Sequence, residues 1–185
     1  MKKVFWTLIP VVLLTGCAMG KGEMEEALAF RSKILGAESV RFEAEVSADY
    51  IDRMEEFDLA CEADAAGALT FRVTEPEEIS GITGTVTGEE GTLTFDDTVL
   101  AFPLLAEERL SPVSGPWVMM KALRSGYITA VVREGDALHI TVDDSYADDA
   151  LTLEIWIEGD EVDACEIGWK GRRQMTMDIG DFRIG

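Results

Sequence analysis

Few side chains in this sequence have the types and spacing that catalysis requires. The chain contains one histidine, His139, within an alternating apolar run from 137 to 142, and this alternation predicts that its ring faces outward. A Ser-His-Asp triad would need Ser111 or Ser145 beside it with a carboxylate behind, yet neither serine lies in a nucleophile-elbow pattern. We therefore expect a protein that is not an enzyme, and we keep a hydrolase only as the third alternative.

Paired carboxylates are abundant, and such pairs serve glycoside hydrolysis or calcium binding in other proteins. Most of them fall at predicted turns, where aspartate stabilises the bend and remains solvated. The segment 143–149 (DDSYADD) is the best calcium candidate, but it lacks the glycine and terminal glutamate of an EF-hand loop. His139, Cys61 and Cys165 do not have the spacing of zinc ligands. The sequence thus predicts no metal site and no cofactor.

The N-terminus carries the pattern of an export signal. A basic start at Lys2 and Lys3 precedes a mostly apolar run from 4 to 14, well short of the roughly 20 apolar residues that a membrane-spanning helix needs. The run ends in Leu14-Thr15-Gly16-Cys17. This tetrapeptide resembles the lipobox of bacterial lipoproteins, in which the cysteine thiol accepts diacylglycerol and becomes the acylated N-terminus. The resemblance implies a signal peptide over 1–16 and a lipid anchor, with diacylglycerol and a palmitate-like acyl chain, at Cys17.

Cys61 and Cys165 both lie in runs of strand-like sequence, and export would place them where disulfides can form. Our preferred interpretation is that they are two small buried hydrophobic residues. A disulfide between them is the alternative.

Composition limits the possible partners. The formal net charge of −20 argues against nucleic acid, whose phosphates require lysine and arginine, and against a polybasic membrane-surface module. A hydrophobic content of 47% is enough for a packed core. After a tether over 17–22, residues 23–185 have a length suited to one domain.

Two segments have the features of helices. Residues 23–35 begin with acidic residues and end with basic ones before Gly36, as expected from the helix dipole. The second predicted helix begins at a Ser114 cap with Pro116 in its first turn and ends at Gly126. One side of this helix carries a bulky apolar stripe, formed by Trp117, Met119, Met120 and Leu123.

The remaining sequence alternates between apolar and polar residues in short runs separated by glycine- and aspartate-rich turns, which is typical of antiparallel strands. The predicted strands span 40–50, 57–63, 69–73, 82–86, 92–95, 99–102, 127–133, 137–142, 151–158, 161–169 and 172–182. About ten antiparallel strands with one apolar face must curl or be covered. We therefore expect mainly antiparallel β structure: an incomplete (half) β-barrel, with the N-terminal helix and the inserted helix covering its concave face.

This layout resembles the LolA/LolB-like superfamily of lipoprotein carriers and lipid-binding lipoproteins. Four segments are also similar to uncharacterised lipoproteins of clostridial type, a group with which a germination-associated lipoprotein is thought to share its fold. The segments are Phe42-x-Ala44-x-Val46-x-Ala48-Asp49-Tyr50, Pro76-Glu77-x-Ile79-x-Gly81-Ile82, Leu110-Ser111-Pro112-Val113 and Glu166-Ile167-x-Trp169-x-Gly171-Arg172-Arg173.

The resemblance implies an unclosed barrel that receives an acyl chain, a similar hydrophobic ligand or a lipoprotein beneath its helices. The candidate lining residues are the stripe Trp117, Met119, Met120 and Leu123, together with Trp156 and Trp169. Methionine-rich surfaces repack around varied apolar partners, as a lid must, although the same stripe also suits an ordinary core-facing helix. The alternative function is an interaction scaffold that docks and regulates an envelope or spore-cortex enzyme. Both hypotheses place the protein on the extracytoplasmic face of the cell membrane, or on an outer membrane if one exists.

Overall fold

The computed structural model describes residues 21–49, 53–88, 90–95, 98–103, 105–106 and 109–185. The predicted signal peptide, Cys17 and most of the tether lie outside these residues. Among the described residues, no helix is long and apolar enough to cross a membrane.

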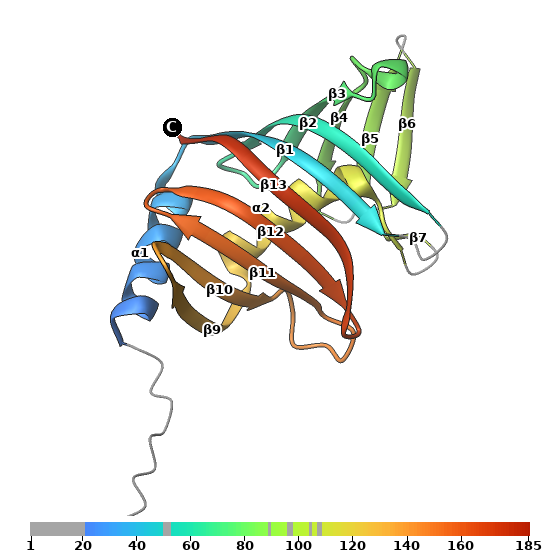
Figure 1. The fold of residues 1–185 in the computed structure, drawn as a ribbon. Helices are drawn as coiled ribbons and strands as arrows, with labels where there is room; N and C mark the ends of the chain where they lie inside the picture. The colour runs from blue at the N-terminus through green and yellow to red at the C-terminus, as the bar shows by residue number, and fades with distance from the viewer. Residues whose placement is uncertain (1–20, 50–52, 89, 96–97, 104, 107–108) are drawn as a thin grey trace, which may run out of the picture.

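A single antiparallel sheet of eleven strands dominates the described chain (Figure 1). Its spatial order is β6-β5-β4-β3-β2-β1-β13-β12-β11-β10-β9, so β6 and β9 are open edges and the sheet does not close. The strands are β1 Ser39–Asp49, β2 Met54–Asp64, β3 Leu69–Glu75, β4 Thr83–Thr87, β5 Glu90–Phe95, β6 Thr98–Pro103, β9 Tyr127–Glu134, β10 Ala137–Asp143, β11 Leu151–Glu158, β12 Glu161–Trp169 and β13 Arg172–Ile184. The predicted antiparallel meander is confirmed, with eleven strands where about ten were expected.

Strand alternation arises as the sequence predicts. In β1, Val40, Phe42 and Ala44 are buried, whereas Arg41 and Glu43 between them are exposed. Because successive side chains of a strand point to opposite faces, the whole sheet acquires an apolar inner face and a polar outer face.

The first and last strands pair with each other at the centre of the sheet. β1 runs antiparallel to β13, from Val40 opposite Ile184 to Ala48 opposite Met175. This pairing joins two hairpin series, β1 to β6 and β9 to β13, into one surface (Figure 1). Several register shifts interrupt the ladders, for example between Trp156 and Ile157, and such bulges increase local twist.

The described residues also form two α-helices. α1 spans Lys21–Gly36 and α2 spans Gly115–Ser125, close to the predicted ranges. Short 3₁₀ turns lie at Glu77–Ile79 (η1) and Pro112–Ser114 (η2), and a two-residue hairpin pairs β7 Leu105–Ala106 with β8 Arg109–Leu110. The sequence analysis did not predict these short elements.

The start of α2 departs from the prediction in one detail. Ser114 occupies the N-cap position, but its hydroxyl makes no capping hydrogen bond and is buried without a hydrogen-bond partner among the described residues. Pro116 in the first turn and Gly126 after the last residue are as predicted.

The predicted fold class is supported at the level of an open antiparallel sheet with two helices, an arrangement consistent with a half-barrel. A two-layer β-sandwich would have divided the strands between two large sheets. The described strands instead form one sheet of eleven and one small hairpin.

Gly84 allows β3 and β4 to approach closely, because a Cβ there would lie 2.4 Å from the Phe71 ring and 2.5 Å from the Thr92 carbonyl oxygen. We predict that Gly84→Ala lowers the free energy of unfolding by about 1–3 kcal/mol, the usual cost of overpacking. Gly180→Ala is the matched control, since nothing lies within 4 Å of its added Cβ. Urea unfolding of both variants measures the difference, and equal midpoints would contradict the prediction.

Candidate functional site

The stripe on α2 lies against the inner face of the sheet. Trp117, Met119, Met120 and Leu123 are 7%, 0%, 2% and 1% exposed and belong to the same core as the strand residues. The Trp117 indole also donates a hydrogen bond to the Gly67 carbonyl oxygen at 2.9 Å. The structure therefore brings these four predicted residues together on one helix face.

Two glycines let α2 approach the sheet closely. A Cβ at Gly115 would lie 2.3 Å from the Met175 sulfur and 3.0 Å from the Met177 sulfur. At the other end of the helix, a Cβ at Gly126 would lie 2.4 Å from Val142. The contact beneath α2 is consequently tight at both ends and rich in methionine, a flexible and polarisable side chain.

Arg31 ties α1 to the C-terminal end of α2. Its Nε donates to the Leu123 carbonyl oxygen at 2.7 Å, and its Nη2 donates to the Ala122 carbonyl oxygen at 3.2 Å. Partial burial lowers the pKa of the guanidinium, but a cation at a helix C-terminus is favoured by the helix dipole. The sequence analysis missed this contact, which joins residues about 90 positions apart.

The two remaining ligand-binding candidates, Trp169 and Trp156, lie on opposite faces of the sheet. Trp169 lies on the same face of β12 as the buried Cys165 and Ile167. It is half-buried and packs against the core. Trp156 lies between the buried Ile155 and Ile157, so its ring is on the outer face, away from α2. The expectation that all six residues line one cavity is corrected: the structure separates Trp156 from the others.

Trp156 instead forms a polar cluster with His139, which faces outward as predicted. The two rings stack with centroids 4.4 Å apart. His139 Nδ1 lies 3.0 Å from Glu134 and Nε2 lies 2.7 Å from Glu154. The Trp156 indole donates to the second oxygen of Glu134 at 3.2 Å. Carboxylates thus occupy both sides of the imidazole, and no serine is among its partners in the described chain.

The other groups with possible chemistry have structural roles here. In the calcium candidate 143–149, Asp143 accepts a hydrogen bond from the Thr152 hydroxyl and Asp144 accepts one from the Leu151 amide. The described residues contain no group of three or more His, Cys, Asp or Glu side chains placed to hold a metal ion.

Cys61 and Cys165 are free and buried, as preferred over a disulfide. They lie on β2 and β12, and β1 and β13 run between these strands. Burial raises the pKa of both thiols above the ordinary cysteine value, so neither is a ready nucleophile.

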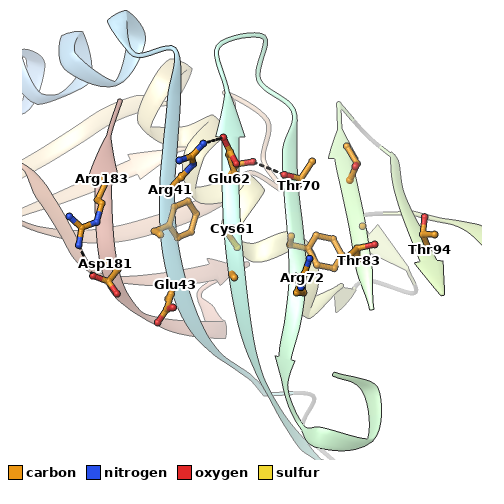
Figure 2. Close-up of a pocket in the computed structure, with 15 residues that line it drawn as sticks. Arg41, Glu43, Cys61, Glu62, Thr70, Arg72, Thr83, Thr94, Asp181 and Arg183 are labelled. Atoms are coloured by element: carbon orange, nitrogen blue, oxygen red, sulfur yellow. Dashed lines mark hydrogen bonds and ion pairs between the residues drawn. The ribbon is translucent and has the colours of Figure 1, made fainter. Parts of the chain in front are cut away.

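Three hollows formed by described residues lie away from α2. The largest of them has a volume of about 680 Å³ and lies on the outer face across β13, β1, β2, β3, β4 and β5, where Arg41, Glu43, Glu62 and Arg72 line it (Figure 2). A second hollow of about 310 Å³ adjoins it over Ala60 and Gly180. A third, of about 280 Å³, lies between α1 and the ends of β10 and β11. No α2 residue lines any of these three hollows, and the stripe side chains of α2 are buried.

Comparison with known proteins bears on the fold. No protein-family model matches the chain, and the curated proteins give no match. Among solved structures, the chain is similar to an uncharacterized conserved protein from Thermus thermophilus, with a TM-score of 0.50 and 12% identity over 88% of this chain and 87% of that protein. A LolA superfamily protein from Nitrosomonas europaea aligns with a TM-score of 0.47 and 8% identity over 86% and 93%. The lipoprotein LppX from Mycobacterium tuberculosis aligns with a TM-score of 0.41 and 12% identity over 87% and 93%. At such identities the likeness describes the fold alone.

The Glu134 carboxylate provides a test of the outer polar cluster. Hydrogen bonds from Trp156 and from His139 lower the pKa of Glu134. A carboxylate with a lowered folded-state pKa stabilises the fold above its unfolded pKa of about 4.3, and this contribution disappears as pH falls through the folded value. We predict that the stability deficit of Glu134→Gln is largest near neutral pH and shrinks between about pH 5 and pH 3.

Urea midpoints over this pH range measure the effect. Glu158→Gln is the control, because Glu158 lies on the same face of the sheet two strands away, on β11, is exposed and has no hydrogen-bond partner among the described residues. A deficit of Glu134→Gln that stays constant with pH would contradict the assignment.

Proposed function

We propose that this protein is a non-enzymatic, lipid-anchored lipoprotein that holds an acyl chain or a similar hydrophobic ligand between α2 and the inner face of its open sheet. In this proposal α1 and α2 cover the concave face, and α2 packs on the core when no ligand is present. The observation that carries the proposal is the methionine-rich contact beneath α2, formed by the helix stripe on one side and by Met175 and Met177 on the other.

The composition of this contact supports exchange between a helix and a ligand. Methionine side chains have three rotatable bonds and can repack around an alkyl chain without a large steric cost. An acyl chain that replaced the α2 stripe would bury apolar surface of the same kind, worth roughly 25 cal/mol per Å². Helix and ligand therefore compete for one apolar face.

The Arg31 contact supports α2 as the moving element. It binds α2 through two backbone carbonyl groups near one end of the helix, so it does not depend on the stripe side chains. Release of these two hydrogen bonds would free the C-terminal end of α2 while the η2 turn stays at the other end. Arg31 thus acts in the proposal as a latch between the two helices.

The position of the three hollows, away from α2, also favours a second candidate function, the interaction scaffold. A protein that only docks and regulates an envelope or spore-cortex enzyme needs no cavity, and the three hollows lie elsewhere. Its partner would use an acidic surface or an open strand edge such as β6, where Val99 and Leu100 are 64% and 60% exposed.

Tryptophan quenching separates the two functions. We predict that bromine-labelled stearate quenches Trp117 saturably in a chain whose other tryptophans are replaced by phenylalanine, because the bromine atoms would lie beneath α2. The matched control keeps only Trp156, which is on the outer face and should not be quenched. Leu123→Asp should abolish quenching while circular dichroism verifies folding. Arg31→Met should speed quenching by roughly thirtyfold, because loss of two hydrogen bonds of roughly 1 kcal/mol each would lower the barrier to release of α2 by roughly 2 kcal/mol.

Equal, unsaturable quenching of Trp117 and Trp156 would reject the acyl-chain function and leave the scaffold. An unchanged rate in Arg31→Met would reject the latch alone.

We further propose that Cys17 carries the lipid, which places the protein on the extracytoplasmic face of the cell membrane, or on an outer membrane if the cell has one. More than one acyl chain at this cysteine would give the stable anchoring that a single chain does not.

Metabolic labelling with an alkyne analogue of palmitate tests this anchor. We predict that the wild-type chain is labelled and partitions into detergent, whereas Cys17→Ser is unlabelled and stays in the aqueous phase. Cys61→Ser is the control and should keep the label, because Cys61 is buried in β2. Labelling that persists in Cys17→Ser would contradict the lipidation site.

A further inference from the structure

The largest of the three hollows, which we name the outer cleft, lies on the polar face opposite α2 (Figure 2). Strand register builds it. One row of directly paired residues crosses six strands in the order Gly180, Glu43, Ala60, Arg72, Thr83 and Thr94. The small side chain of Ala60 lies between two long ones, Glu43 and Arg72, and so leaves a depression between a carboxylate and a guanidinium.

On the side of the outer cleft formed by β13, β1 and β2, charged side chains neutralise one another in two ion pairs. Arg41 pairs with Glu62 at 2.9 Å, and Arg183 pairs with Asp181 at 3.0 Å (Figure 2). These two ion pairs fix four of the charged side chains that line the cleft. They leave little net charge on this side for a ligand to use.

Glu43 and Arg72 differ from these pairs. Both are exposed, and within the part of the chain that the structure describes neither has a hydrogen-bond or ion-pair partner. The two positions are separated by two strand spacings, roughly 10 Å between Cα atoms, with β2 between them.

The remaining polar groups of the cleft lie on the Arg72 side. Thr83 is paired directly with Arg72 across β3 and β4, and Thr94 follows it in the same row. Thr70 and Thr85 form a second pair, two residues further along the same strands, but the Thr70 hydroxyl already donates to the Glu62 carbonyl oxygen at 3.3 Å. A guanidinium beside several hydroxyl groups suits a phosphate or carboxylate, since it donates two parallel hydrogen bonds while hydroxyl groups donate others.

We propose that the outer cleft binds a zwitterionic group, with a phosphate or carboxylate on Arg72 and an ammonium on Glu43. The two uncompensated side chains supply one charge of each sign, and Ala60 leaves the space between them. A polyanion is disfavoured because Glu43 and the overall charge of −20 repel it. An acyl chain is disfavoured because the side chains that face the cleft are mostly polar. The site does not depend on ligand uptake beneath α2, which lies on the other face.

Chemical-shift titration of the full ¹⁵N-labelled chain carrying Cys17→Ser tests the proposal. Phosphoethanolamine should bind more tightly than inorganic phosphate or ethanolamine alone and should shift the amides of Glu43, Arg72 and Thr83. Arg72→Met should weaken phosphoethanolamine by about fivefold or more through loss of a charge-assisted contact. Arg173→Met is the matched control, because Arg173 lies on β13, pairs with Glu166 at 2.7 Å and does not line the cleft.

A second variant tests the ammonium partner. Glu43→Gln should weaken phosphoethanolamine but leave phosphate unchanged or tighter, so that the preference for the zwitterion disappears. Glycylglycine, which joins an ammonium to a carboxylate, tests which anion the cleft accepts. Binding of both glycylglycine and phosphoethanolamine indicates that the cleft accepts either anion of a zwitterion. Binding of phosphoethanolamine alone indicates that it requires a phosphate of the headgroup type. Equal affinities of wild type for phosphate and phosphoethanolamine, or equal effects of Arg72→Met and Arg173→Met, would overturn the proposal.

Discussion

The structure depends on one constraint: an eleven-stranded sheet with a single apolar face must keep that face out of water. Open antiparallel sheets of this size curl or need a cover. In this chain the two hairpin series cannot separate to pack on each other as independent layers, because β1 and β13 hold them together along a long central ladder. Side chains from outside the sheet contribute to the core on this face: Phe30 and Ile34 of α1 and the stripe of α2 belong to the same cluster of buried residues as the strand side chains.

Three features describe the contact of α2 with its neighbours. Its ends approach the sheet through glycines, methionines of the sheet lie beside its first residue, and Arg31 of α1 binds two of its backbone carbonyl groups. A cover of this kind gains most of its stability from non-directional apolar burial. Another apolar object of similar width could provide the same burial, which is why the contact suits both a permanent core and a removable lid.

How well the sequence predicts a feature of this protein depends on how far apart in the chain the residues that determine it lie. The alternation in β1 and the limits of α2 are local properties, so the sequence identified both within a few residues. The outward position of Trp156 was also available, because Ile155 and Ile157 flank it with the opposite parity, but its large apolar ring suggested a cavity instead. The Arg31 contact and the β1–β13 pairing have no local signal, since each joins positions far apart in the chain.

The outer cleft is the strongest example of a feature that sequence cannot reveal. Glu43, Ala60 and Arg72 are ordinary outward residues of three different strands, and only the pairing register places them in one row. A shift of one residue in any of these strands would turn its outward side chains toward the core. The same register that buries Phe42, Cys61 and Phe71 on the inner face therefore creates the polar depression on the outer face. The two faces present opposite chemistries to their surroundings, so the two proposed ligands would not compete for the same side chains.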